Sequence, residues 1–555
     1  MSARPGVQIA HLPTGIPGLD EILGGGLPEY SFNLIAGTPG AGKTTLAHQL
    51  MFSLATTARP ALYFTLIGEP PLKMLRYQQQ FTFFDPVAMG ERIRFIDLSD
   101  LALEQNLGLV LDAIVRQVEE GNPGLVFVDS FQTIMRAATE AGQQMSLQRF
   151  VQRLAVHLTG WQATTFLIGE FLGDQLHGNP VFTIADGIVQ LTQSTDRNSS
   201  VRKLRVVKSR GQAPMPGLHT FRITGAGMQI FPRITSPLEA AHARNRARAG
   251  DARLASGVAG LDTLLGGGIP VGDALLVSGP SGTGKSALAT QFIAAGAAAG
   301  EPGVIAVFEE HPQEYLQRAA TFGLDLATLV EQNRLAIIYI RPLDLSPDET
   351  LYEIQEAVRR VGARRVVIDS VSGFELALAP SFREDFRESF YRLVGALTGT
   401  GVTVLLTMEV EPDDTGLRFS PYIISFLADD IVLLRYDERE EGLRKSLTVI
   451  KMRNSDHDEA RWRYEVTGQG VIVREQLRRG APSSVQPGLT GREATVGRAL
   501  TELGEVSAAA LAQRTGLTAA DLTFALDRLV SLGYATRIVV GDETVFRSVA
   551  QGSGG

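Results

Sequence analysis

The chain has 555 residues, of which 20% are charged and 44% hydrophobic, with a formal net charge of −8 and no cysteine. This length exceeds what a single hydrophobic core supports, and the charge supplies no overall basic field for nucleic acid. The missing cysteine excludes disulfides, thiolate catalysis and cysteine-bound zinc. The N-terminal residues have no apolar signal core, and no apolar run reaches the ~20 residues of a membrane span. We therefore expect a cytoplasmic protein of several domains that does not enter a membrane.

A glycine-rich loop stands near the start of the chain, between an apolar run and a helix-like run. It matches the pattern G-x-x-x-x-G-K-[ST] through Gly37, Thr38, Pro39, Gly40, Ala41, Gly42, Lys43 and Thr44, with Thr45 next. In this setting the glycines let backbone N–H groups turn towards phosphate oxygens, and the helix adds its positive N-terminal end. The Lys43 ammonium group then reaches the β- and γ-phosphates, and the Thr44 hydroxyl group holds Mg²⁺. We therefore expect ATP and Mg²⁺ to bind here.

Beyond this loop, apolar runs alternate with longer amphipathic runs. The apolar runs span residues 61–66, 93–96, 125–128, 165–168 and 187–191, and helical patterns span 107–118 and 147–158. Alternating strands and helices predict a parallel sheet that is covered on both faces. Strands that are apolar throughout are typical of burial on both sides. The predicted fold class is α/β, with the phosphate loop at the carboxyl edge of the sheet.

The same organisation returns in the second half of the chain, 242 residues later. Residues 14–28 recur as 256–270, and no gap intervenes before a second glycine-rich loop. That loop comprises Gly279, Pro280, Ser281, Gly282, Thr283, Gly284, Lys285 and Ser286, followed by Ala287. We therefore predict two duplicated domains, each followed by a linker. The domains span 8–234 and 256–477, and the linkers span 235–255 and 478–490.

A phosphate-loop ATPase needs a second metal anchor at the end of another strand. In each copy an apolar run ends in Asp-Ser, with the carboxylate at Asp129 in the first and at Asp369 in the second. The separations from the loop lysines are similar, 129 − 43 = 86 and 369 − 285 = 84. We therefore predict that Thr44 and Asp129 hold Mg²⁺ in the first copy, and Ser286 and Asp369 in the second.

Hydrolysis also requires a group that orients the attacking water or accepts its proton. In the second copy, Glu309 and Glu310 follow an apolar run and could orient this water, although a solvated acidic loop is the alternative. Subtracting 242 places Ile67 and Gly68 opposite them in the first copy, and Glu69 lies one residue further on. Hydrolysis is therefore expected in the second copy, whereas in the first it depends on Glu69 substituting by a one-residue shift.

The motif at 14–28 and its repeat, together with a phosphate loop and an Asp-Ser pair in each copy, resemble the KaiC family of RecA-like ATPases. The resemblance covers about residues 8–475. It implies two RecA-like domains that hydrolyse ATP with Mg²⁺ and assemble as hexameric rings with ATP between subunits. The adjacent catalytic glutamates of the family match Glu309 and Glu310.

The resemblance also implies a basic pair that reaches the phosphates of a neighbouring subunit. The matching residues are Lys208 and Arg210 in the first copy, and Lys451 and Arg453 in the second. A cation donated by a neighbour would neutralise the charge that develops on the γ-phosphate. The alternative is a surface strand that carries two alternating cations.

Clock members of the family also transfer phosphate to an adjacent Ser-Thr pair in the second domain. The matching residues here are Ser425 and Phe426, and phenylalanine has no hydroxyl group. A two-site phosphorylation cycle is therefore excluded. Ser425 stays open either as a single phosphoacceptor or as a serine that is merely packed in apolar surroundings.

The last segment, 491–550, differs from both copies. Helical stretches at 495–503, 507–514 and 518–532 precede strand-like stretches at 534–540 and 543–547. This order is typical of a winged helix-turn-helix domain. Six arginines, no lysine and seven acidic residues give the segment a net charge of 6 − 7 = −1. Because DNA affinity depends largely on phosphate neutralisation, protein contact or self-association is favoured over weak DNA contact.

Taken together, these patterns predict a ring-forming, Mg·ATP-dependent ATPase of the signalling or regulatory type, with a homo-hexamer and unidentified regulatory proteins as partners. The second copy is expected to be the more active site. Two alternatives remain from the sequence. One is a serine/threonine protein kinase that modifies itself at Ser425, and the other is a RecA-like DNA-binding or transcription-regulating module.

Overall fold

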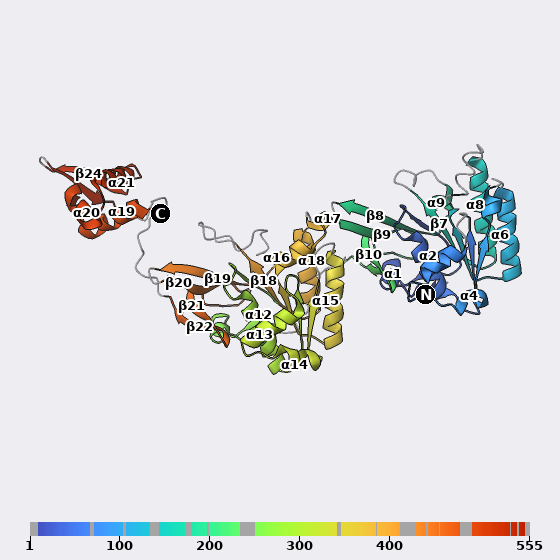
Figure 1. Ribbon diagram of the computed structural model, residues 1–555, viewed down its shortest axis with the longest axis horizontal. Coiled ribbons are helices and arrows are strands. Elements are labelled where there is room, and N and C mark those ends of the chain that lie inside the picture. Colours follow the sequence, from blue (N-terminus) through green and yellow to red (C-terminus); the bar gives the residue numbers. More distant parts are fainter. Residues whose placement is uncertain are drawn as a thin grey trace, which may run out of the picture. The chain divides into compact units, whose positions relative to one another are not determined.

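The computed structural model describes residues 9–66, 71–103, 107–131, 133, 144–171, 180–196, 199–233, 250–340, 346–383, 386–410, 428–439, 442–453, 455–477, 491–532, 534–540 and 543–549. The chain divides into two compact units, Met1–Glu475 and Gln476–Gly555. The larger unit contains two nine-stranded sheets and the smaller a three-stranded sheet (Figure 1). Within the described residues, no helix has both the length and the apolar character that a membrane span requires.

The first domain is built around a sheet with the strand order β11-β10-β9-β8-β3-β7-β6-β4-β5. Its strands are β3 Phe32–Gly37, β4 Ala61–Thr65, β5 Ile93–Asp97, β6 Leu125–Asp129, β7 Thr164–Glu170, β8 Gly187–Asp196, β9 Ser199–Ser209, β10 His219–Thr224 and β11 Gly227–Phe231. The six strands from β5 to β8 in this order are parallel, and β9 to β11 are antiparallel. The short strands β1 (His11–Leu12) and β2 (Leu27–Pro28) pair separately.

Helices cover both faces of this sheet (Figure 1). They are α1 Leu19–Leu23, α2 Lys43–Leu54, α3 Pro71–Gln78, α4 Ala88–Glu91, α5 Ser99–Leu103, α6 Leu107–Gly121, α8 Gln144–Gly160 and α9 Pro180–Ile184. Leu34 of β3 packs in one core with α6 and α8, whereas the next residue, Ile35, packs in another core with α2. Successive residues of a strand face opposite sides, so an apolar run is needed wherever both sides are covered. The predicted α/β fold with a mostly parallel sheet is confirmed.

The second domain repeats this architecture strand for strand. Its order, β16-β15-β17-β18-β14-β19-β20-β21-β22, is the order of the first sheet read from the other end. The strands are β14 Ala274–Gly279, β15 Gly303–Val307, β16 Leu335–Tyr339, β17 Arg365–Asp369, β18 Thr403–Glu409, β19 Asp430–Arg439, β20 Gly442–Lys451, β21 Trp462–Thr467 and β22 Gly470–Gln476, with β12 Arg253–Leu254 and β13 Ile269–Pro270 as a separate pair. The helices are α11 Leu261–Leu264, α12 Lys285–Ala298, α13 Pro312–Thr321, α14 Leu326–Glu331, α15 Pro347–Val361, α16 Val371–Ala377, α17 Pro380–Arg383 and α18 Phe386–Thr398.

The carboxyl edge of each sheet gathers the residues that the sequence pointed to. Gly37, the last residue of β3, lies opposite Glu170 at the end of β7. At the same edge, Asp129 ends β6 and lies opposite Thr65, which ends β4. Because these strands are parallel, all their ends meet at one edge, and the second sheet arranges its corresponding residues in the same way. The fold therefore brings the phosphate loop and the carboxylates of each copy together.

The C-terminal unit has the helices α19 Gly491–Leu503, α20 Ala508–Thr515 and α21 Ala519–Ser531, and the strands β23 Val506–Ser507, β24 Ala535–Val540 and β25 Glu543–Ser548. The predicted caps are confirmed, since Ser507 and Thr518 accept backbone N–H groups at the starts of α20 and α21. Gly516 ends α20 in a left-handed conformation. The sequence did not reveal β23, which is too short to show a period and pairs with β25. Assignment to the winged helix-turn-helix class stays a prediction, as do the domain limits.

Candidate functional site

Each predicted phosphate loop lies between a strand and a helix. Residues 38–42 connect β3 to α2, and residues 280–284 connect β14 to α12. The loop lysine, the hydroxyl residue after it and the next residue form the first turn of each helix. Both loops therefore present their N–H groups beside a helix N-terminus, where an anion is favoured.

The last residue of each loop is a glycine, and its backbone conformation favours glycine over any residue with a side chain. Gly42 has a φ of 97° and Gly284 a φ of 100°, both in the left-handed region that favours glycine. A Cβ atom on Gly42 would lie 2.6 Å from Ile223 Cδ1, and one on Gly284 would lie 2.9 Å from Val466 Cγ2. The backbone angle thus favours glycine, and a larger residue would also displace a neighbouring side chain, as expected for a loop whose N–H groups surround a phosphate.

The side chain of each loop lysine folds back onto its own loop. Lys43 Nζ donates to the Thr38 carbonyl oxygen at 2.9 Å, and Lys285 Nζ donates to the carbonyl oxygens of Gly279 at 2.9 Å and Pro280 at 2.8 Å. Burial lowers the pKa of both lysines, and nearby carboxylates oppose the shift. These carboxylates are Glu170 and Asp129 for Lys43, and Glu409, Asp369 and Glu309 for Lys285. A partly buried ammonium group held by carbonyl oxygens is well placed to exchange them for phosphate oxygens.

A hydroxyl group and a carboxylate meet beside each loop. Thr44 Oγ1 donates to Asp129 Oδ2 at 3.1 Å, and Ser286 Oγ donates to Asp369 Oδ1 at 3.2 Å. Mg²⁺ prefers such hard oxygen ligands and completes its octahedron with water and phosphate oxygens. The chemistry of these donors therefore fits Mg²⁺, which Thr44 and Asp129 would hold in the first copy and Ser286 and Asp369 in the second.

A further hydroxyl group binds each of these carboxylates, and it comes from a different strand in each copy. In the first domain, the buried Tyr63 on β4 donates to Asp129 Oδ2 at 2.7 Å. In the second, Thr407 on β18 donates to Asp369 Oδ1 at 2.5 Å. The repeat places Ile305 at the position of Tyr63 (63 + 242 = 305). Sequence reasoning missed both hydroxyl groups, because a tyrosine or threonine within a buried strand carries no local signature.

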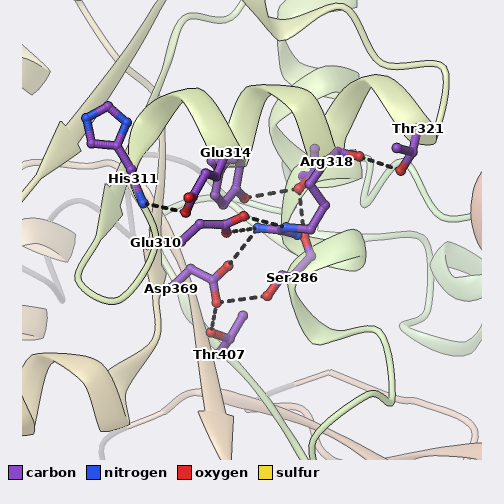
Figure 2. A network of polar contacts seen from close by, with 10 residues as sticks. Ser286, Glu310, His311, Glu314, Arg318, Thr321, Asp369 and Thr407 are labelled. Carbon is purple, nitrogen blue, oxygen red and sulfur yellow. Dashed lines mark hydrogen bonds and ion pairs between the residues drawn. The ribbon is translucent and has the colours of Figure 1, made fainter.

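Glu309 and Glu310, the two adjacent carboxylates of the second copy, lie beside Ser286 and Asp369 and have different partners. Ser370 Oγ donates to Glu309 Oε1 at 3.1 Å. Arg318 binds Glu310 through two hydrogen bonds, from Nε at 3.2 Å and from Nη2 at 2.7 Å. Figure 2 shows Arg318 reaching from α13 towards Glu310 and Asp369, and its Nη2 lies 3.9 Å from Asp369 Oδ2. The structure therefore adds an arginine to the predicted site.

The residues of the first copy that correspond to this pair, 67–69, lie outside the described residues. The helices that follow are informative, because Met74 and Gln78 are buried on α3 as Tyr315 and Ala319 are on α13. Both pairs have the same separation, 315 − 74 = 241 and 319 − 78 = 241. The strands before them, β4 and β15, are separated by 303 − 61 = 242. The first copy thus has one residue more in this connection. Counted back from the helix, Glu69 takes the place of Glu310, which supports the one-residue shift as a hypothesis.

Comparison with known families identifies the architecture. The family model described as an ATPase of the KaiC type matches residues 12–235 and 254–478, which is most of the chain. The chain belongs to the KaiC family. The circadian clock oscillator protein KaiC of Parathermosynechococcus lividus is 27% identical over 478 residues, covering 84% of this chain and 85% of the relative. The circadian clock protein KaiC3 of Synechocystis sp. is 27% identical over 484 residues, covering 85% and 93%.

The basic pairs matched from the KaiC family bind within their own chain. Lys208 Nζ donates to the carbonyl oxygens of Phe182 and Thr183 at 3.1 and 3.0 Å, and Arg210 forms an ion pair with Asp186 at 3.1 Å. The second copy repeats the pattern, in that Lys451 Nζ donates to the Ala428 carbonyl oxygen at 2.7 Å and Arg453 pairs with Asp429 at 3.1 Å. In both copies these contacts hold the segment just before a parallel strand, β8 or β19.

The same pairs lie at the sheet edge opposite the phosphate loop of their own domain. Ser209, at the end of β9, lies opposite Gly187, which in turn lies opposite Asn33 near the start of β3. Gly37 is four residues further along β3, and at ~3.3 Å per residue this amounts to about 13 Å. Lys208 and Arg210 therefore cannot contact phosphates that are bound in their own domain.

One more carboxylate completes each site, and both were missed from the sequence. Glu170 and Glu409 end β7 and β18, each opposite the first glycine of its phosphate loop. Glu170 Oε1 lies 4.0 Å from Lys43 Nζ. The signal that could have revealed them is a carboxylate at the end of a buried strand in both copies. The predicted phosphoacceptor Ser425 lies outside the described residues.

Proposed function

We propose that this KaiC-family protein is a Mg·ATP hydrolase of the signalling or regulatory type, and that its second domain is the principal active site. One observation carries the assignment. In the second domain two adjacent carboxylates, Glu309 and Glu310, follow the strand that precedes α13, and Glu310 is within reach of the arginine beside Asp369. In the first domain, residues 67–69 offer one carboxylate, Glu69.

The residues of the second site divide the work between them. Lys285 and the loop N–H groups neutralise the phosphates, and Lys285 is close enough to Glu309 for this carboxylate to affect its pKa. We assign Glu309 as the residue that orients the attacking water and accepts its proton, because it is the member of the pair that lies near the phosphate-binding ammonium group. Glu310, which Arg318 binds, is assigned the supporting role of helping Glu309 to orient this water. The Mg²⁺ held by Ser286 and Asp369 supplies charge neutralisation and orientation of the phosphates.

The position of the basic pairs supports assembly into a ring. Lys208 and Arg210 lie at the sheet edge away from their own phosphate loop, and Lys451 and Arg453 end the corresponding strand of the second domain. Such cations can neutralise a γ-phosphate only when another protomer places its nucleotide against them. We therefore propose a homo-hexamer in which each protomer completes the sites of its neighbour, as the KaiC resemblance implies.

The charges of the C-terminal unit favour a protein partner over DNA. Five arginines of the segment 491–550 are in ion pairs with carboxylates of the same segment. These pairs are Arg492–Asp521, Arg514–Glu502, Arg528–Glu493, Arg537–Asp527 and Arg547–Glu505. Cations that are already neutralised release little from the counterion layer of DNA. We propose a winged-helix domain that contacts a regulatory protein or another copy of itself, with at most weak DNA binding.

The relatives named above are circadian clock proteins. We propose a comparable regulatory role for this chain. A serine/threonine kinase activity is the second candidate, carried only by the hydroxyl group at Ser425, and labelling of that peptide by γ-labelled ATP would support it.

The test compares two lysine variants in steady-state phosphate release. We expect Lys285→Ala to lower turnover roughly 100-fold, since an electrostatic contact to the reacting phosphate is lost, and Lys43→Ala to keep it within about threefold. Both variants should be assayed as the full chain, with particle mass measured with and without ATP. Retained turnover in Lys285→Ala together with its loss in Lys43→Ala would reverse the assignment of the two domains.

A further inference from the structure

The contacts of Arg318 single it out among the residues near the second site. Its guanidinium group binds both oxygens of Glu310, at 3.2 and 2.7 Å, and its Nη2 lies 3.9 Å from Asp369 Oδ2. One face of the group is covered, since its carbon lies 4.4 Å from the centre of the Tyr315 ring. Tyr315 is itself fully buried, and its hydroxyl group is 3.0 Å from Thr290 Oγ1. One cation thus connects a carboxylate of the adjacent pair with the carboxylate that would hold Mg²⁺ (Figure 2).

This arrangement fixes Arg318 in place before any ligand enters. A side-on guanidinium–carboxylate contact with two hydrogen bonds sets direction as well as distance. Stacking on a buried aromatic ring adds a second constraint. The side chains of Arg318 and Glu310 are 28% and 30% exposed, so solvent screens the pair only in part. Glu310 therefore has its orientation set by Arg318 rather than by water.

The helix that carries Arg318 does not depend on it for folding. The side chains of His311 and Glu314 cap the start of α13, and Tyr315 and Ala319 bury its apolar face. In the first copy the helix position that matches Arg318 is Tyr77 (318 − 241 = 77), which is 59% exposed. The position that matches Tyr315 is the buried Met74 (315 − 241 = 74). The same helix therefore forms in the first domain without a cation at this place, and Arg318 is a feature of one copy only.

A cation at this place has two physical effects, one on Mg²⁺ binding at Asp369 and one on the orientation of Glu310. Its charge neutralises Asp369 while no Mg²⁺ is bound, and it repels a divalent cation that binds to the same carboxylate a few ångströms away. Its planar fork holds Glu310, which a compact ammonium group could not do in the same geometry. The charge and the shape of Arg318 thus act on different steps, metal binding and turnover.

We propose that Arg318 is a positioning residue of the second site, which orients Glu310 for hydrolysis and raises the Mg²⁺ concentration that this site needs. The inference rests on the proposed function, in which Ser286 and Asp369 hold Mg²⁺ together with ATP.

The test separates charge from shape in a chain that carries Lys43→Ala, so that the second site alone reports. The probe is the fluorescent nucleotide mant-ATP, whose binding is titrated with Mg²⁺ in parent, Arg318→Gln and Arg318→Lys proteins. We expect Arg318→Gln to lower the half-saturating Mg²⁺ concentration roughly three- to tenfold, since a nearby positive charge is removed. Arg318→Lys keeps the charge and should keep the Mg²⁺ dependence of the parent within about twofold. Phosphate release should fall roughly tenfold in both, because neither holds Glu310 in the same way.

A matched control removes the same charge elsewhere in the domain. Arg359 is 63% exposed on α15, which packs on the opposite face of the sheet from α13. Arg359→Gln should leave both the Mg²⁺ titration and phosphate release unchanged, and thermal melts of all variants show whether the fold is intact. An identical Mg²⁺ titration for the parent and a folded Arg318→Gln would overturn the inference while the proposed function stands. Failure of the parent to bind mant-ATP at any Mg²⁺ concentration would instead overturn the proposed function, and the inference with it.

Discussion

The two KaiC-type domains of this chain share the residues proposed to bind a nucleotide and differ in the side chains around them. Both have the left-handed glycine before the helix, the lysine that folds onto its loop, and the hydroxyl–carboxylate pair at the strand end. They differ in the second hydroxyl group on the carboxylate, in the carboxylates before the next helix, and in the arginine on that helix. Duplication has therefore kept the parts that depend on backbone conformation, while side chains that adjust charge and orientation have diverged.

The difference is most informative at the connection between the strand and the next helix. In the second domain, Glu309 and Glu310 occupy this connection. The first domain has one residue more there, so Glu69 matches Glu310 only when residues are counted back from the helix. Under the proposed function, two domains with the same sheet order divide binding and hydrolysis through this connection alone.

The largest effect that would sharpen this comparison is expected at the carboxylates. Glu309→Gln preserves the shape of the side chain but cannot accept a proton, so turnover of the full chain should fall roughly 100-fold. Glu69→Gln in the first domain should change it by less than about threefold, and this variant is the matched control. Steady-state phosphate release measures both. Equal losses in the two variants would show that the domains hydrolyse ATP alike.

A second difference concerns the stability of the fold at acid pH, and it lies five residues after the loop lysine. His48 in α2 packs against the rings of Tyr63 and Phe95, whereas the second domain has Thr290 there (48 + 242 = 290). Burial lowers the pKa of His48 from 6.5 to about 4, and Gln78 opposes the shift only in part. The folded domain thus favours neutral His48, and its stability falls as the pH drops from ~6.5 towards 4. Between pH 7 and 5 this amounts to about 2 kcal/mol.

The measurement uses the two tryptophans, since Trp161 lies in the first domain and Trp462 in the second. Urea unfolding of a Trp462→Phe chain, followed by Trp161 fluorescence, reports on the first domain at each pH. His48→Thr should remove about 2 kcal/mol of the pH-dependent loss, whereas the buried His219, whose pKa is also lowered by burial, contributes equally to both proteins. A pH dependence that is the same in variant and parent would contradict the assignment.

The smallest expected effect concerns the hydroxyl group that Asp129 and Asp369 each bind on a neighbouring strand. Tyr63→Phe removes the donor to Asp129, and Thr407→Val removes the donor to Asp369. A hydrogen bond to a buried charge stabilises by about 1.5 kcal/mol, so each variant should lower the free energy of unfolding of its own domain by that amount. Trp161 and Trp462 fluorescence distinguish the two domains. A loss in the other domain, or in neither, would show that these hydroxyl groups are not equivalent.

The sequence was sufficient wherever a local pattern has one physical reading. The glycines and lysine of each loop, the aspartate that ends an apolar run and the repeat itself led to the fold and to the residues proposed to bind phosphate and metal, which the structure places together at one sheet edge. Arg318 could not be foreseen, because one arginine on an amphipathic helix is indistinguishable from a solvated one. Its role depends on Tyr315, Glu310 and Asp369 meeting in space. For the same reason, the exchange of Tyr63 for Thr407 appears only when neighbouring strands are compared.

The extra residue before α3 has a consequence for anyone who exchanges parts between the two domains. A chimera that is joined within the strand inherits one register for its catalytic segment, and a chimera that is joined within the helix inherits another. The strand, the connection and the helix therefore form one transplantable cassette, 61–78 in the first domain and 303–319 in the second. Cutting the cassette anywhere inside would misalign the acid groups even if every residue in it were correct.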